Sequence, residues 1–149
     1  LNNLADFTKI HTSDTNIIKD IALQNSTCTL GITNSYYLGF QILENPSIPV
    51  GIKFLSLKDG GVSTNGIGIG ITAASDKAAQ ARSFVEFTLS KEMQEYFSTA
   101  NQDFPANTHF KFPVNIKDWK GFAVTPQNWE NYSDKIDTAK EIFEDVDYE

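Results

Sequence analysis

Segments with helical periodicity alternate along this chain with short apolar segments of the kind found in buried strands. Ser13 or Asp14 can cap a helix that runs to about Gln24, because isoleucines recur on one face at helical spacing. Residues 28–32 are apolar and partly β-branched, and residues 51–57 form a second apolar segment that ends at a glycine-rich turn. The alternation predicts an α/β architecture, in which ligands bind in a crevice at the carboxyl ends of the strands.

A glycine-rich segment and further helices make up the rest of the chain. Residues 61–75 alternate glycine with isoleucine, which is typical of a strand where backbones approach closely, or of a hinge between lobes. The other expected elements are a brief helix over residues 38–43, a helix from Ser75 or Asp76, a second from Ser90, and a final amphipathic helix from Ser133.

The charge balance argues against several classes of partner. The chain has 12 Lys and Arg against 19 Asp and Glu, a formal net charge of -7, so a general attraction to nucleic acid or to anionic lipid is not expected. No apolar run approaches the roughly eighteen residues of a membrane-spanning helix. The chain begins with Leu1 and reaches a helix within a short distance, which we interpret as a processed or excised piece of a longer protein.

Few residues offer soft metal ligands or catalytic groups. Cys28 is the only cysteine, which excludes an intrachain disulfide and a metal centre built from several thiolates. His11 and His109 both lie in predicted loops with no second donor at ligand spacing, which favours solvated side chains. The acidic residues between Glu141 and Glu149 lack the spacing and central glycine of a calcium loop, and no hydrolase elbow or phosphate loop is present.

Two adjacent tyrosines, Tyr36 and Tyr37, follow the first predicted strand in the sequence GITNSYYLG. In a continued strand they would point to opposite faces, but in a helical turn that begins after Asn34 they diverge by only about 100° and can approach one ion. Fe³⁺ favours anionic oxygen donors and would drive a phenol to ionise at neutral pH. The alternative is that both rings are ordinary packing groups with their hydroxyls at the rim.

Three segments resemble the ferric-iron-binding receptors of ABC importers. They are DTNIIKDIALQNSTCTLGITNSYYLG, KAAQARSFVEFTLSKEMQEYFS and NQDFPAN. The resemblance implies an α/β fold that is part of a two-lobe periplasmic-binding-protein-like structure, of which this chain covers roughly the second half. It also implies that residues 1–66 lie in the second lobe with the tyrosine pair, that 67–108 cross through a hinge into the first lobe, and that 109–149 return to the second lobe.

The same resemblance implies site residues and partners. Tyr36 and Tyr37 match the paired tyrosines that ligate Fe³⁺, and Asn34 and Asn16 match residues that contact a bound synergistic anion in some members; Asn16 can equally bond local backbone near a helix start. Further metal ligands would come from the absent N-terminal half. The expected partner is an ABC transporter permease, and the expected location is periplasmic or extracytoplasmic, including that of a membrane-anchored lipoprotein. No enzymatic activity is expected.

Three other functions remain open at this stage. The chain could belong to a receptor of the same fold for an inorganic anion or a small organic molecule, with the tyrosines stacking or donating hydrogen bonds. A hydrolase would require Ser35 or Ser63 to meet a histidine and a carboxylate. An interaction domain without a ligand would bury Tyr36 and Tyr37 in a filled core.

Overall fold

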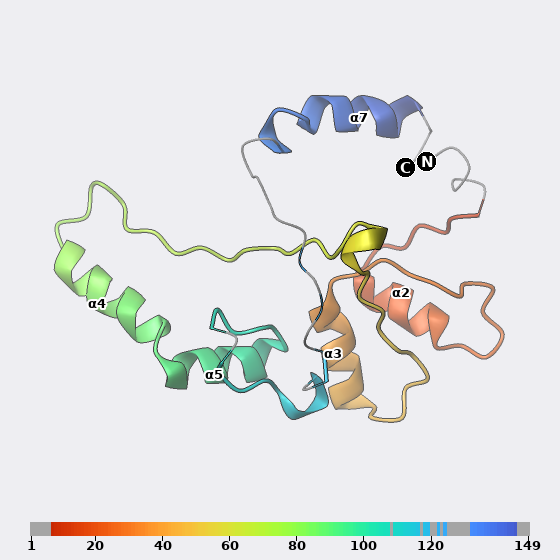
Figure 1. The fold of residues 1–149 in the computed structure, drawn as a ribbon, viewed down its shortest axis with the longest axis horizontal. Coiled ribbons are helices and arrows are strands. Elements are labelled where there is room, and N and C mark those ends of the chain that lie inside the picture. The colour runs from red at the N-terminus through yellow and green to blue at the C-terminus, as the bar shows by residue number, and fades with distance from the viewer. Residues whose placement is uncertain are drawn as a thin grey trace.

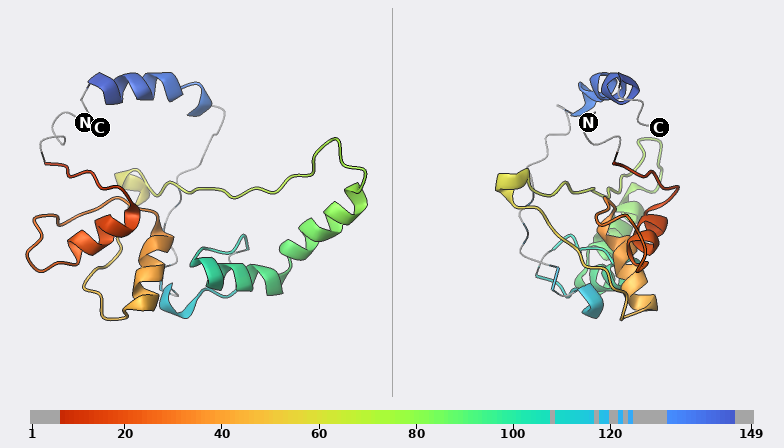
Figure 2. Two further views of the ribbon diagram at one scale, coloured as in Figure 1. Left: turned by 180° about the vertical axis from the view of Figure 1, so that it is seen from behind. Right: turned by 90° about the vertical axis from the view of Figure 1, so that its right-hand side faces the viewer.

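The structure is a computed structural model, and it describes residues 7–107, 109–116, 118–119, 122, 124 and 132–145. Helices α2 (Asp14–Ile21) and α3 (Ser35–Glu44), from the first part of the sequence, lie together (Figure 1). A long extended segment leads away from them to α4 (Ala78–Thr88), and α5 (Lys91–Asn101) leads back toward α3 (Figures 1 and 2). Within the part of the chain that is described, no helix is both long enough and apolar enough to cross a membrane.

Helix α2 (Asp14–Ile21) begins where the sequence predicts and ends slightly earlier. Ser13 is its N-cap and accepts a hydrogen bond from the backbone N–H of Asn16, which satisfies one of the amide groups left open at a helix start. The helix buries Ile18, which is 2% exposed. After Ile21 the chain turns, and the hydroxyl of Ser26 donates to Asp20 on the helix.

Helix α3 (Ser35–Glu44) is longer than the predicted helix over residues 38–43. Its buried face packs closely at Gly39, where a Cβ atom would lie 2.8 Å from Cβ of Gln102. Asn115 completes this contact, because its amide donates to the Gly39 carbonyl at 2.9 Å and to Oε1 of Gln102 at 2.5 Å. Backbone and side-chain hydrogen bonds therefore hold the middle of α3 against the chain that follows α5.

The first two predicted strands are extended segments that pair with no neighbouring strand among the described residues. Residues 28–32 and 51–56 carry no strand in the structure, and residues 57–59 form a short 3-10 helix, η1 (Leu57–Asp59). The one β-pairing among the described residues is an isolated parallel bridge between Val62 and Val124. A strand needs a neighbour for its backbone hydrogen bonds, and Leu30 and Ile32 are 90% and 96% exposed. The described residues are therefore rich in helix and do not confirm the predicted α/β fold.

The remaining elements follow the sequence pattern more closely. Helix α4 (Ala78–Thr88) begins later than predicted, because its N-cap is Lys77 and neither Ser75 nor Asp76. The hydroxyl of Ser75 accepts from the backbone N–H of Lys77. Helix α5 (Lys91–Asn101) has the predicted cap, since Ser90 accepts from the backbone N–H of Met93. The other two elements are the 3-10 helix η2 (Val114–Ile116) and the helix α7 (Ile136–Asp145), which begins later than the predicted start at Ser133.

The predicted hinge over residues 61–75 is an extended connection between the α2–α3 region and α4 (Figure 1). The assignment of residues 1–66, 67–108 and 109–149 to two lobes stays a prediction. Part of the acidic C-terminal run, including Asp147 and Glu149, lies outside the described residues.

Candidate functional site

The two adjacent tyrosines lie in the first turn of α3, which begins at Ser35, directly after the N-cap Asn34. Their rings lie side by side, with centroids 4.3 Å apart and planes inclined at 32°. Both side chains are partly buried rather than sealed in a core. The helix therefore begins at the position that allows the two phenols to lie close together.

A carboxylate on α2 holds the start of α3 in place. Oδ1 of Asp14 accepts a hydrogen bond from the hydroxyl of Thr33 at 2.6 Å and another from the backbone N–H of Asn34 at 2.8 Å. Asp14 is the first residue of α2, so this contact joins the N-terminal ends of the two helices. The backbone that carries Tyr36 is thus fixed by a side chain far away in the sequence.

The electrostatic surroundings of the tyrosine pair are negative. A side-chain hydrogen bond with Tyr37 is the largest cause that raises the pKa of Tyr36 to about 12, followed by partial burial. The charges of Asp14 and Asp103 raise the pKa of Tyr36 further, because they disfavour a nearby phenolate. Tyr36, Asp14, Asn34 and Asp103 all line one broad, open hollow of the described surface. Near Tyr36, the carboxylates of Asp14 and Asp103 favour a cation over an anion.

The two asparagines expected to contact an anion have other partners in the structure. Oδ1 of Asn34 accepts from the side-chain amide of Asn65 at 3.0 Å, which connects the tyrosine loop to the glycine-rich segment. The side-chain amide of Asn16 donates to the hydroxyl of Thr12 at 3.0 Å, a local contact of the kind expected near a helix start. Asn34 lies close to the tyrosines in the sequence. The side chain of Asn16 is instead bonded to Thr12, in the segment before α2.

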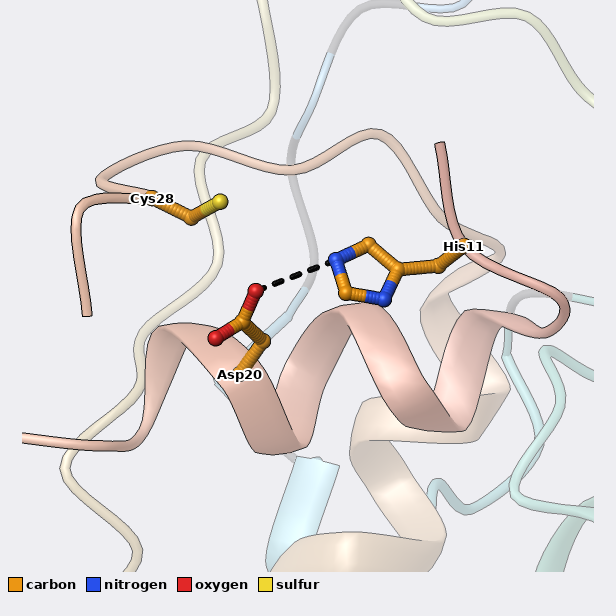
Figure 3. Close-up of side chains that lie close together, drawn as sticks. All are labelled: His11, Asp20 and Cys28. Carbon is orange, nitrogen blue, oxygen red and sulfur yellow. Dashed lines mark ion pairs between the residues drawn. The ribbon is translucent and has the colours of Figure 1, made fainter. Parts of the chain in front are cut away.

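A second group of possible ligands lies around α2 and was not found from the sequence. His11, Asp20 and Cys28 offer one ligand atom each, and these atoms all lie within 4.8 Å of one another (Figure 3). Nε2 of His11 lies 3.1 Å from Oδ2 of Asp20. No spacing motif covers these positions, but His11 and Cys28 lie on either side of a predicted helix that contains Asp20. A helix flanked by two such loops was the signal that could have placed them together.

A family model described as "Bacterial extracellular solute-binding protein" matches residues 3–132. Searches of curated proteins and of solved structures found no significant match. The family match includes the tyrosine pair, the glycine-rich segment and helices α2 to α5. The chain belongs to the bacterial extracellular solute-binding protein family.

Proposed function

We propose that this chain is part of a receptor that captures ferric iron through the phenolates of Tyr36 and Tyr37 and delivers it to the permease of an ABC importer. Membership of a solute-binding family supports the role of a receptor, and the family description supports a periplasmic or other extracytoplasmic location. The observation that carries the choice of iron is the side-by-side arrangement of the two phenol rings, 4.3 Å apart at their centroids.

The chemistry of the pair favours a hard, highly charged cation over other solutes. In the absence of a cation, the pKa of Tyr36 at about 12 keeps its phenol protonated at neutral pH, chiefly through the hydrogen bond with Tyr37. A trivalent ion offsets this preference, because its charge stabilises both phenolates and also interacts favourably with the carboxylates of Asp14 and Asp103. The same carboxylates would oppose an inorganic anion, unless the anion arrived together with the metal.

The capture step follows from these positions. Fe³⁺ binds the two phenolic oxygens, and the proton of each hydroxyl passes to solvent. Donors from elsewhere in the full protein, or a synergistic anion, complete the coordination of the ion. The Asp14 contact fixes the backbone at Asn34, so the phenols are already positioned before the ion binds. They therefore lose little conformational freedom on binding.

A competition experiment tests the iron assignment. The protein is titrated with Fe³⁺ against a chelator of known affinity, alongside the double variant Tyr36→Phe/Tyr37→Phe and the control Tyr96→Phe. Tyr96 is a suitable control because it is a 63% exposed tyrosine on α5, well away from α3 in sequence. We expect the double variant to lose competition with the chelator and the control to match the parent. Equal affinity in all three proteins would rule out iron binding by the pair.

The same proteins separate iron from a different solute. If the tyrosines stack on an organic molecule instead, that molecule raises the melting temperature of the parent by mass action while Fe³⁺ does not. A panel of small organic acids and inorganic anions, measured by thermal shift with and without Fe³⁺, therefore distinguishes the two receptors. Stabilisation by an organic solute alone would favour the second candidate.

A further inference from the structure

Three side chains with different donor atoms converge beside α2. His11 comes from the chain before the helix, Asp20 from its last turn and Cys28 from the loop that follows (Figure 3). All three are partly buried, and one nitrogen, one oxygen and the sulfur lie within 4.8 Å of one another. In a tetrahedral zinc site, metal–ligand bonds of about 2.0–2.3 Å imply donor separations of about 3–4 Å. Small side-chain rotations would therefore close the three donors on one ion.

We propose that the His11–Asp20–Cys28 cluster is a second metal site, which binds a borderline-soft divalent cation such as Zn²⁺. The donor set combines imidazole, carboxylate and thiolate, the ligands that Zn²⁺ uses in proteins. Three protein ligands leave one position for water. Cys28 binds as the thiolate, and its proton passes to solvent when the metal–sulfur bond forms.

The arrangement fits chelation better than a proton relay. In a relay of cysteine, histidine and aspartate, the carboxylate holds one ring nitrogen of the histidine and the sulfur approaches the other. Here Asp20 contacts Nε2 of His11, and the sulfur of Cys28 lies on the same side of the ring (Figure 3). The nitrogen of His11, the oxygen of Asp20 and the sulfur of Cys28 therefore surround one common space. They do not form the linear arrangement that a proton relay needs.

Lys9 holds the carboxylate when no metal is bound. Its Nζ lies 2.8 Å from Oδ2 of Asp20, and its side chain is 60% exposed, so it can leave without breaking a buried contact. Oδ1 of the same carboxylate accepts from the hydroxyl of Ser26 at 3.2 Å, which orients the group. The hydrogen bond from Lys9 lowers the pKa of Asp20 to about 2, so the carboxylate is ionised at neutral pH. A metal ion would replace the ammonium group of Lys9 as the partner of Asp20.

This site is chemically distinct from the tyrosine pair. Thiolate and imidazole prefer Zn²⁺ and related divalent ions, whereas paired phenolates prefer hard Fe³⁺. The two sites also share no ligand. Loss of one should leave the other able to bind, and their optical signatures differ because one is a sulfur-to-metal transition and the other a phenolate-to-iron transition.

Cobalt(II) provides a direct test, since it replaces Zn²⁺ and gives a near-ultraviolet thiolate charge-transfer band. The reduced, chelator-treated protein is titrated with Co²⁺ and then with Zn²⁺. We expect a band that Zn²⁺ abolishes, that Cys28→Ser lacks, and that needs at least about tenfold more Co²⁺ in His11→Ala. The matched control His109→Ala, a change at an exposed loop histidine, should behave like the parent. Tyr36→Phe/Tyr37→Phe should also keep the band.

Two further measurements cover the case in which a variant folds poorly. Zn²⁺ should slow the alkylation of Cys28 in the unaltered protein, which needs no substitution. Lys9→Gln removes the competing ammonium group and should strengthen Co²⁺ binding. Absence of the thiolate band together with unchanged alkylation in Zn²⁺ would overturn the proposal, and so would equal Co²⁺ binding by His11→Ala and His109→Ala.

Discussion

Oδ1 of Asp14 accepts a hydrogen bond from the backbone N–H of Asn34 at 2.8 Å, and this contact joins the first residue of α2 to the N-cap of α3. The side chain of Asn34 does not cap its own helix, because it is bonded to Asn65. Asp14 therefore satisfies a backbone N–H at the start of α3, as a capping residue would, although it lies far from α3 in the sequence. The position of Tyr36 and Tyr37 depends on a residue that no local motif around them would identify.

Two substitutions of Asp14 separate its geometric role from its charge. Asp14→Ala removes the acceptor for Thr33 and Asn34, and we expect a loss of about 1–2 kcal/mol in the free energy of unfolding, as for a lost helix cap. Asp14→Asn keeps an oxygen acceptor and removes only the charge, so it should retain more of that stability. Urea unfolding of both variants checks the order. Equal losses in the two variants would mean that the charge, not the acceptor, is what matters.

The acid side of the stability profile should reflect Asp14 and Asp20. Partial burial acts to raise the pKa of Asp14, but the hydrogen bonds from Thr33 and Asn34 together outweigh it and lower that pKa below 3.8. The hydrogen bond from Lys9 is the main cause that lowers the pKa of Asp20 to about 2. Groups with lowered folded-state pKa values stabilise the fold above the unfolded-state value and lose this effect as the pH falls through the folded-state value.

The free energy of unfolding should therefore decline as the pH falls from about 4 to about 2. Asp14→Asn should show a shallower decline than the parent, because it removes one of the two groups responsible. Asp76→Asn, a change at an exposed carboxylate before α4, serves as the control and should follow the parent curve. A parent curve that is flat over this range would contradict the assignment.

Iron binding should weaken in acid. The pKa of Tyr36 is raised to about 12, mainly by the hydrogen bond with Tyr37, so the phenol is protonated before Fe³⁺ arrives and must release its proton. Apparent affinity should rise by about tenfold per pH unit for each proton released between about pH 6 and about pH 8. Competition titrations at several pH values, each with its own chelator blank, give the number of protons. An affinity independent of pH would argue against phenolate ligands.

Gly31 brings the loop after α2 into close contact with the helix. A Cβ atom at this position would lie 2.3 Å from Cγ2 of Ile17 and 2.7 Å from Cδ1 of Ile21. Gly31→Ala should destabilise the protein by about 1–3 kcal/mol, because Ile17 is branched at Cβ and has little freedom to move aside. Gly66→Ala is the matched control, since its Cβ would meet nothing within 4 Å. Chemical unfolding of both variants should show the larger loss at Gly31.

Helix positions could be read from the sequence because their signals are local. Ser13 and Ser90 both cap the helices that follow them, as predicted, since a cap depends only on a hydroxyl and the next few backbone amides. The apolar pattern predicts α3 only over residues 38–43, and a helical turn after Asn34 enters only as the condition for the two tyrosines to approach one ion. The helix begins three residues earlier than this pattern predicts and ends one residue later. The contacts of Asp14 that hold its start come from far away in the sequence.

Pairing between segments that lie far apart in the sequence could not be predicted from such local signals. Residues 28–32 have the composition of a strand, but composition does not supply the neighbouring backbone that a strand needs. The same limit applies to His11, whose position beside Asp20 and Cys28 depends on how two loops fold back along α2. The apolar pattern of a helix indicates which face is buried, but not which polar side chains meet on the other face.

Resonance Raman spectroscopy of the iron-loaded protein tests the central claim most directly. Excitation within the visible band of the Fe³⁺ complex should enhance the ring vibrations of tyrosinate, because only phenolates bound to the metal share that transition. Iron binding by the tyrosine pair predicts these vibrations in the parent and in Tyr96→Phe, and their loss in Tyr36→Phe/Tyr37→Phe. An iron complex of the parent without tyrosinate vibrations, or one whose spectrum survives the double substitution, would contradict it.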